Sequence, residues 1–291
     1  MWLQLKFELH ADEAERLADL IERAGAVSVT MQDAADQPLY EPALGTTPLW
    51  KLTWVLGLFE ADTDIDAVLQ QIETALGKPL PEYKLNPLED KDWVRAWLDD
   101  FKPMRFGENL WIIPSTFTPP NPEAVNILLD PGLAFGTGTH PTTAMCLSWL
   151  DAHPPLNKTV IDYGCGSGIL AIAACKLKAS QALGVDTDPQ ALLATESNAL
   201  NNQVEHLITT CLPRDCPTYT VDLLMANILA GPLEELAPAL AALVRPEGQI
   251  ILSGILETQT ANLIQAYTPY FDIQLFKQQD EWICLEGIRK P

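Results

Sequence analysis

A glycine-rich turn between an apolar strand and an apolar helix constrains the fold of this chain more than any other feature. Apolar residues at 160–161 lead into Asp162, and a second apolar run begins at Ile169. Three glycines at alternate positions lie between them: Gly164, Gly166 and Gly168. Glycines allow a backbone to approach a ligand closely, and the start of a helix favours anionic or polar groups. The turn therefore predicts a ligand site at the carboxyl end of a buried strand.

The spacing of these glycines distinguishes between two nucleotide ligands. The dinucleotide fingerprint GxGxxG places its third glycine where this chain has Ile169, which disfavours a nicotinamide oxidoreductase. A second apolar strand at 182–185 ends in Asp186, whose carboxylate can accept hydrogen bonds from both hydroxyls of a ribose. An acid of this kind together with the GxGxG turn is typical of an S-adenosylmethionine site. Four residues are assigned to this cofactor: Asp162, Gly164, Gly166 and Asp186.

A long polar loop precedes the glycine turn. Residues 130–143 hold three glycines and four threonines, whose N–H groups and hydroxyls can wrap a polar ligand. A helix is predicted over 141–153, and side chains in its first turn could hold the methionine carboxylate of the cofactor. The alternative is a simple helix cap by Thr139. Three residues of this loop are assigned to the cofactor: Phe135, Thr142 and Thr143.

Asn227 is the candidate catalytic residue and a further cofactor contact. It follows a predicted strand at 221–226, and in open α/β sheets ligands bind outside the carboxyl ends of the strands. Its side-chain oxygen can accept a hydrogen bond from an attacking amine and orient the lone pair of the nitrogen. A role as cap of the following helix is compatible with this one. His140 is a weaker candidate, as a general base, because Pro141 follows it and loop histidines are often structural.

The second part of the chain alternates between strands and helices, which predicts an α/β fold with a doubly wound sheet. The predicted strands cover 158–163, 181–186, 206–211, 221–226, 249–253, 271–277 and 281–288. The predicted helices cover 168–178, 189–201, 231–243 and 257–268. Only residues 278–280 join the last two strands, and a connection this short permits a hairpin but no parallel crossover. An antiparallel last strand is typical of the Rossmann-like class I methyltransferases.

The first part of the chain predicts a smaller α+β domain. Strands at 2–9, 27–31, 50–59 and 82–85 and helices at 12–24 and 64–76 give the order βαββαβ, which is the ferredoxin-like arrangement. We assign residues 1–85 to this domain, 86–104 to a linker and a helix, and 105–291 to the methyltransferase domain. Segments at 109–113 and 125–129 are predicted to form a hairpin that leads into the second domain.

Composition narrows the possible partners. The net charge is −21, and the first 90 residues hold 17 acidic against six basic side chains. Such a surface repels nucleic acid and anionic membranes and attracts basic proteins. The six cysteines form no CxxC pair and the four histidines are scattered, so we expect reduced thiols, a cytoplasmic location and no metal site. No segment is typical of a signal peptide or a membrane span.

Three segments together resemble the bacterial ribosomal-protein L-eleven methyltransferase family (PrmA). They are the loop at 130–143, the turn at 160–170 and the run at 227–232, and the likeness in layout extends over nearly the whole chain. The resemblance implies transfer of methyl groups from S-adenosylmethionine to lysine side-chain and N-terminal amines of one basic ribosomal protein, free or on the ribosome. It also implies that the small domain binds this substrate. The cofactor residues that it implies are Thr143, Gly164, Asp186 and Asn227.

The run after Asn227 separates this chain from some related enzymes. Other relatives, which modify amine and amide nitrogens, carry Asn-Pro-Pro-Tyr here, whereas this chain has Ile228 and Leu229 in place of the two prolines. An amide target is therefore less favoured than an amine. Two other hypotheses remain: a class I methyltransferase that acts on another protein or on a small molecule, and a cofactor-binding interaction module without catalysis.

Overall fold

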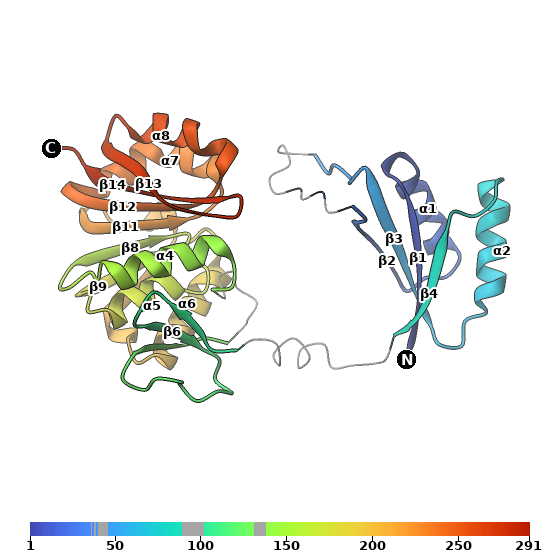
Figure 1. The fold of residues 1–291 in the computed structure, drawn as a ribbon, viewed down its shortest axis with the longest axis horizontal. Helices are drawn as coiled ribbons and strands as arrows, with labels where there is room; N and C mark the ends of the chain where they lie inside the picture. Colours follow the sequence, from blue (N-terminus) through green and yellow to red (C-terminus); the bar gives the residue numbers. More distant parts are fainter. Residues whose placement is uncertain (36, 38, 40–45, 89–101, 131–137) are drawn as a thin grey trace. The chain divides into compact units, whose positions relative to one another are not determined.

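The computed structural model describes the chain except for residues 36, 38, 40–45, 89–101 and 131–137. The chain divides into two compact units, Met1–Ala96 and Trp97–Pro291 (Figure 1). This division falls within the segment 86–104 that we assign to the linker, most of which lies outside the described residues. Each unit has its own hydrophobic core, so each is described by itself below.

The first unit is a four-stranded sheet with two helices. Its elements are β1 (Trp2–His10), α1 (Ala11–Arg23), β2 (Ser28–Asp33), β3 (Leu52–Glu60), α2 (Ile65–Leu76) and β4 (Tyr83–Leu88), which confirms the predicted order βαββαβ. The sheet order is β2-β3-β1-β4, and every pair of neighbours is antiparallel. Alternate residues of β1, such as Leu5 and Phe7, pack with Leu17 and Ile21 of α1 in one buried cluster.

One boundary of the first unit differs from the prediction. Residues 86–88, which we expected in the linker, are the last three of β4 and pair with the start of β1, Trp2 lying opposite Leu88. The polar residue Asn86 and the imide Pro87 suggested the end of the strand. Since β4 is an edge strand, it has an unpaired side, and strands of this kind tolerate a proline whose nitrogen faces solvent. The long neighbouring strand β1 therefore sets the length of β4.

The second unit contains a seven-stranded sheet. Its strands are β8 (Thr159–Tyr163), β9 (Gln181–Val185), β10 (Ile208–Cys211), β11 (Val221–Asn227), β12 (Val244–Leu256), β13 (Phe271–Gln279) and β14 (Trp282–Arg289). They lie in the order β10-β9-β8-β11-β12-β14-β13. The pairs from β10 to β12 are parallel, and β14 is antiparallel to both of its neighbours. The predicted antiparallel last strand is confirmed, but it lies inside the sheet, between β12 and β13.

Helices cover both faces of this sheet, as the doubly wound prediction requires. The helices are α4 (Pro141–Ala152), α5 (Ile169–Lys176), α6 (Pro189–Asn201), α7 (Ala230–Ala242) and α8 (Thr260–Tyr267). Side chains of α4, α5 and α6 share one buried cluster with the sheet, and those of α7 and α8 share another. No helix in the described part of the chain is long and apolar enough to cross a membrane.

Three predicted bounds in this unit are corrected. The strand predicted over 206–211 begins only at Ile208, because a 3₁₀ turn occupies Glu205–Leu207. The helix predicted over 257–268 begins with a 3₁₀ turn at Glu257–Gln259 before α8. The strand predicted over 249–253 extends in both directions into β12, a length that its pairing with β11 and β14 supports.

A small three-stranded sheet begins the second unit, and here the predicted hairpin is wrong. Its strands are β5 (Met104–Phe106), β6 (Leu110–Ile113) and β7 (Val125–Leu128). The pair β6–β7, which we expected to be antiparallel, is parallel, and the hairpin is formed by β5 and β6. The tight turn of this hairpin includes Gly107, whose φ is +66°. The proline-rich segment 114–124 is long enough to carry the chain back for a parallel pairing.

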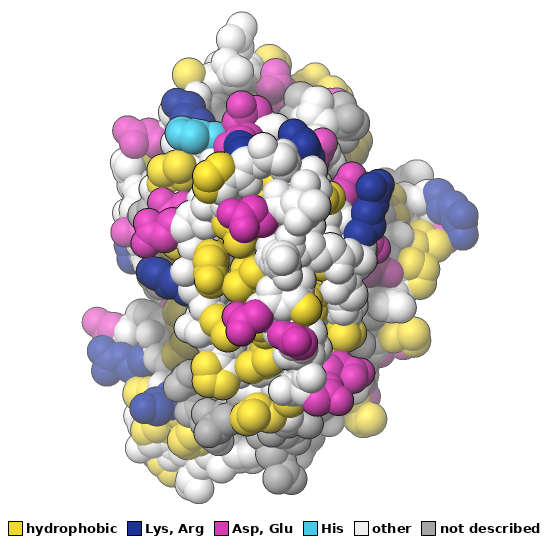
Figure 2. Space-filling view, turned by 90° about the vertical axis from the view of Figure 1, so that its right-hand side faces the viewer, with side chains coloured by type: hydrophobic (Ala, Val, Ile, Leu, Met, Phe, Trp, Pro, Cys, Tyr) yellow, Lys and Arg dark blue, Asp and Glu magenta, His cyan; other side chains and the backbone are white. Residues whose placement is uncertain are grey.

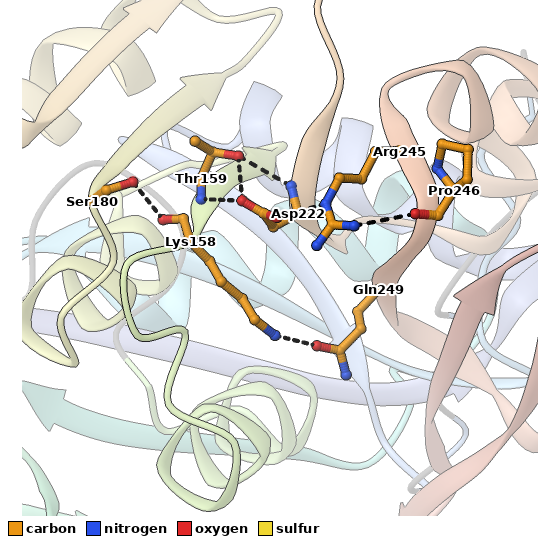
Figure 3. Close-up of polar contacts among 7 residues, drawn as sticks. All are labelled: Lys158, Thr159, Ser180, Asp222, Arg245, Pro246 and Gln249. Atoms are coloured by element: carbon orange, nitrogen blue, oxygen red, sulfur yellow. Dashed lines mark hydrogen bonds and ion pairs between the residues drawn. The ribbon is translucent and has the colours of Figure 1, made fainter.

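A polar network ties the amino ends of the central strands together (Figure 3). The Oδ2 atom of Asp222 on β11 accepts hydrogen bonds from the backbone N–H of Thr159, at 2.8 Å, and from its hydroxyl, at 2.9 Å. The Nε atom of Arg245 donates to Oδ1 at 2.6 Å. Burial alone would raise the pKa of Asp222, but these hydrogen bonds and the charge of Arg245 outweigh it and hold that pKa below its ordinary value. This network lies at the edge of the sheet opposite the ligand site.

Replacing Asp222 with alanine is expected to lower the free energy of unfolding at pH 7 by about 1–3 kcal/mol, because it leaves the N–H of Thr159 without its partner. A carboxyl whose folded pKa is depressed stabilises the fold above its unfolded pKa, and this contribution is lost as pH falls through the folded pKa. The difference between urea titrations of Asp222→Ala and of the wild type should therefore shrink as pH falls below about 4. Asp272→Ala is the control, because its 3.6 Å ion pair with Lys290 is exposed; a loss of equal size there would contradict the prediction.

Candidate active site

The glycine turn connects β8 to α5 in a conformation that requires glycine. Gly164 has a φ of +79° and its N–H donates to the carbonyl of Val185 on β9 at 2.7 Å. Gly168 has a φ of +77°, and a Cβ atom there would come within 2.7 Å of the Thr195 methyl group on α6. A side chain at Gly164 would overlap Cγ2 of Ile228, the residue that follows β11. The turn is therefore packed between β9, α6 and the end of β11.

Two residues that the sequence analysis missed hold the turn in place. On α6, the Thr195 hydroxyl donates to the carbonyl of Gly166 at 3.1 Å, and the Asn198 amide donates to the carbonyl of Ser167 at 2.8 Å. Both side chains satisfy carbonyl oxygens of the turn from outside. The signal that could have found them is their spacing of three residues on a helix that follows the second strand, because such residues share one face.

Asp186 lies directly after β9 and contacts the turn. Its Oδ2 accepts a hydrogen bond from the N–H of Gly166 at 2.9 Å, and its Oδ1 accepts one from the N–H of Asp188 at 3.0 Å. Each carboxylate oxygen has a second lone pair. The carboxylate is thus fixed from two sides and keeps the acceptor capacity that two ribose hydroxyls require.

Asp162 is a buried carboxyl below the turn. Its side chain is 1% exposed, and its Oδ2 accepts a hydrogen bond from the N–H of Ala171 at 3.0 Å. Burial raises the pKa of Asp162 to about 7; the Ala171 N–H opposes this rise and the charge of Asp186 adds to it. A carboxyl that costs stability and titrates near neutral pH is typical of a functional site.

Asp162→Asn is expected to stabilise the fold, and to do so increasingly as pH rises from 5 to 8. A carboxyl with a raised folded pKa stabilises the fold fully below its unfolded pKa, and this contribution disappears as pH rises through about 7. Asparagine keeps the acceptor for Ala171 without the charge, so the gain at pH 8 should be roughly 2–4 kcal/mol. Chemical denaturation at both pH values measures it. Asp215→Asn, at a side chain that is 62% exposed, should leave the free energy of unfolding unchanged. An effect of Asp162→Asn that does not vary with pH would refute the raised pKa of Asp162.

The first turn of α4 is capped by His140. Its Nδ1 accepts a hydrogen bond from the N–H of Thr142 at 3.4 Å and lies 2.8 Å from the hydroxyl of the same residue. Its ring packs edge-on against Trp282, with 4.8 Å between ring centroids. Burial lowers the pKa of His140, against the opposing charge of Glu281. The cap is therefore His140 and not Thr139, and this structural role accounts for the histidine.

Asn227, the last residue of β11, meets Thr143 of α4. The Asn227 amide nitrogen donates to the Thr143 hydroxyl at 3.1 Å, and the Thr143 side chain is buried. The N-cap of α7 is Leu229, without a side-chain bond, so the cap role that we considered for Asn227 is not observed. Because the Asn227 nitrogen donates to Thr143, the oxygen on the other side of the amide group is the atom that can accept a hydrogen bond from a ligand.

The predicted site residues therefore come together at the carboxyl edge of the sheet. One group surrounds the glycine turn, the other joins α4 to β11, and the contact of Gly164 with Ile228 connects the two. Phe135 lies outside the described residues. The structure adds Ser253 of β12, which the sequence analysis missed; its buried hydroxyl donates to the carbonyl of Thr142 at 3.1 Å.

These features define a class of protein. A sheet with one antiparallel strand next to its edge, a glycine turn after β8 and an acid after β9 form the Rossmann-like class I methyltransferase fold. A solved structure described as a ribosomal protein L11 methylase from Lactobacillus delbrueckii subsp. bulgaricus is 36% identical, with a TM-score of 0.60. The similarity covers 66% of this chain and all of that one.

The sequence comparisons extend over the whole chain. The family model described as ribosomal protein L11 methyltransferase (PrmA) matches residues 1–290, and the chain belongs to this family. Proteins named ribosomal protein L11 methyltransferase from Azotobacter vinelandii and Pseudomonas aeruginosa are each 52% identical over 290 residues, which cover 99% of both chains. The protein of that name from Teredinibacter turnerae is 50% identical, over 99% of this chain and 97% of its own.

Proposed function

We propose that this chain transfers methyl groups from S-adenosylmethionine to lysine side-chain and N-terminal amines of ribosomal protein L11. One observation carries this function: the hydrogen bond that joins Asn227 to Thr143 beside the glycine turn, in a chain of this family. This hydrogen bond supports a role for the Asn227 oxygen as an acceptor at the carboxyl edge of the sheet. That edge also carries the glycine turn and the Asp186 carboxylate, which suit the cofactor.

The residues around the turn fit the proposed cofactor. The second lone pairs of Asp186 suit the ribose hydroxyls, and the turn at Gly164 and Gly166 lets the backbone approach the ligand. At the start of α4, Thr142 and Thr143 suit the methionine carboxylate. Phe135 completes the proposed set. The carboxylate of Asp162 lies below the turn, where a negative charge favours a cationic ligand.

The reaction needs a positioned, neutral amine. S-adenosylmethionine would supply an electrophilic methyl group and leave as the neutral thioether S-adenosylhomocysteine when the bond from sulfur to that methyl group breaks. The oxygen of Asn227 accepts a hydrogen bond from the amine and turns the nitrogen lone pair toward that methyl group, while Thr143 holds the other side of the amide. Such alignment supplies most of the rate, and the proton of the amine can leave to water before attack. No dedicated base is needed.

The first unit is proposed to be the ferredoxin-like domain that binds the substrate, extended to residue 88 by the end of β4, with a linker and helix up to residue 104 and the catalytic domain at 105–291. Its acidic composition suits a basic ribosomal protein, free or on the ribosome, rather than nucleic acid. Asp and Glu side chains are spread over the face of the molecule that Figure 2 shows. All six cysteines are free thiols, which fits a reducing compartment such as the cytoplasm.

Mass spectrometry of purified L11 after incubation with this chain and S-adenosylmethionine tests the function. We expect mass increases in steps of one methyl group on lysine and N-terminal residues, and their loss with Asn227→Ala. Gln274→Ala removes an exposed amide on the edge strand β13 and serves as the matched control. If L11 keeps its mass while another polypeptide of a cell extract takes labelled methyl groups, the substrate is wrong.

The pH dependence should distinguish the two kinds of amine. Lysine, with an ordinary pKa of about 10.4, costs roughly 4.6 kcal/mol to deprotonate at pH 7, whereas an α-amine with a pKa of about 8 costs roughly 1 kcal/mol. Methylation of lysine in single turnovers should therefore accelerate by about 100-fold from pH 7 to pH 9, and that of the α-amine by about tenfold at most. Site-resolved mass spectrometry measures both in one reaction. A flat lysine profile would argue against attack by a neutral amine formed from the ammonium.

A further inference from the structure

A β-bulge interrupts β12 beside the end of β11. The antiparallel register between β12 and β14 shifts between Leu252 and Ile255, so that Ser253 and Gly254 fall inside the irregular stretch. In the parallel register with β11, Ser253 lies opposite Asn227. Bulges are frequent next to active sites, where they change the direction of a side chain. The bulge of β12 thus adjoins the candidate catalytic residue.

Ser253 connects the bulge to α4. Its hydroxyl donates a hydrogen bond of 3.1 Å to the carbonyl of Thr142, and both side chains are buried. Thr142 precedes Thr143, whose hydroxyl accepts the hydrogen bond from Asn227. The bulge therefore holds the first turn of α4 in a fixed position relative to the end of β11.

Gly254 connects the bulge to the segment after β11. Its φ is +84°, and a Cβ atom at this position would overlap the carbonyl oxygen of Ile228 and lie 2.9 Å from its carbonyl carbon. On another side, Ile228 packs against Gly164 through its Cγ2 atom. Ile228 is thus confined by two glycines from two other elements. Because it follows Asn227 directly, its position sets the direction of the Asn227 backbone.

We infer that the Ser253–Gly254 bulge is a positioning element of the methyl-transfer site, acting on Thr143 through Ser253 and on Asn227 through Gly254. The inference rests on the proposed function, since it assigns the two residues to the placement of that site. Ser253 and Gly254 are positioning residues, whereas Asn227 is the residue that contacts the amine. The two halves of the bulge act on different properties: Ser253 on the affinity for the cofactor, and Gly254 on the rate of transfer.

Two measurements on the full-length chain test this division. The first is calorimetric titration with S-adenosylhomocysteine, in which Ser253→Ala should bind about tenfold more weakly than the wild type. The matched control is Tyr267→Phe, which removes another buried hydroxyl that donates to a carbonyl, that of Leu233 on α7 at 2.8 Å. This control should bind within twofold of the wild type. Equal losses in both variants, or none in Ser253→Ala, would overturn the role of Ser253.

The second measurement is steady-state methyl transfer to L11. Gly254→Ala should lower kcat by about 100-fold, because a displacement of about 1 Å at reacting groups has effects of this size. Its KM for the cofactor should stay within threefold. Gly107→Ala, in the β5–β6 hairpin, combines a positive φ of +66° with a Cβ atom that would overlap Oδ2 of Asp151, and should keep its kcat. A kcat of Gly254→Ala within twofold of the wild type would overturn the proposal.

The titration separates failure of this inference from failure of the proposed function. S-adenosylhomocysteine binding needs no protein substrate, so it decides the role of Ser253 even if the wild type leaves L11 unmodified. Unmodified L11 would refute the substrate assignment alone. If Gly254→Ala does not fold, as circular dichroism would show, the titration of Ser253→Ala decides instead: a folded variant with wild-type affinity for S-adenosylhomocysteine overturns the positioning role of the bulge.

Discussion

Replacing Asp186 with alanine is expected to weaken the binding of S-adenosylmethionine by about 100-fold, which corresponds to roughly 3 kcal/mol. The carboxylate is held by the N–H groups of Gly166 and Asp188, at 2.9 and 3.0 Å, and the lone pair left on each oxygen is available to one ribose hydroxyl. Alanine removes both acceptors and leaves the N–H of Gly166 without its partner. Isothermal titration of the purified chain measures the loss.

Two further variants make this prediction specific. Asp186→Asn keeps one oxygen acceptor and should lose less affinity than Asp186→Ala. Asp188→Asn changes a neighbouring carboxylate whose Oδ1 caps α6 by accepting from the N–H of Gln190 at 2.8 Å, a bond that asparagine retains. This control should bind the cofactor like the wild type. If Asp186→Ala is folded and binds within threefold of the wild type, the ribose does not contact Asp186.

The meeting of Asp186 with the glycine turn could be predicted from the sequence because topology alone produces it. The strands β8 and β9 are consecutive, parallel and adjacent, so their carboxyl ends reach the same edge of the sheet. The glycines and the acid stand at these ends. The apolar runs and the tight turns between them therefore predicted the doubly wound sheet, its antiparallel last strand and half of the site.

Other contacts could not be predicted because they depend on pairing between distant segments. The bond from Asn227 to Thr143 joins residues 84 positions apart, and that from Ser253 to Thr142 spans 111 positions. The sequence placed the first pair near one edge but gave no sign of the bulge that brings Ser253 there. The predicted direction of β7 relative to β6 was wrong for the same reason, because a short apolar strand can pair equally well in parallel or antiparallel direction.

The helix cap shows a limit of a different kind. Threonine is a common N-cap residue, and the sequence contains Thr139 just before the predicted helix. In the structure α4 begins at Pro141, as predicted, but its cap is the ring nitrogen of His140, which packing against Trp282 holds in place. Trp282 lies on β14, and its proximity is a tertiary contact. Local capping preference is therefore overridden by the packing of an aromatic pair.

Gly164→Ala is expected to lower the rate of methyl transfer by at least about 100-fold, because it displaces groups that must be aligned. Two effects combine at this position. The φ of +79° costs a residue with a side chain about 1–2 kcal/mol. The added Cβ atom also overlaps Cγ2 of Ile228, which must move and take Asn227 with it. Single-turnover methylation of L11 at saturating cofactor measures the loss.

A double variant separates these two effects. Gly107→Ala provides strain and overlap in the β5–β6 hairpin, since its φ of +66° is similar and its Cβ atom would overlap Oδ2 of Asp151, so this variant should lose stability but keep its rate. Ile228→Ala removes the Cγ2 atom that meets the new side chain. The variant with both Gly164→Ala and Ile228→Ala should therefore be at least tenfold faster than Gly164→Ala, although it stays below Ile228→Ala alone. A double variant no faster than Gly164→Ala would show that Gly164 acts through its contact with the cofactor and not through Ile228.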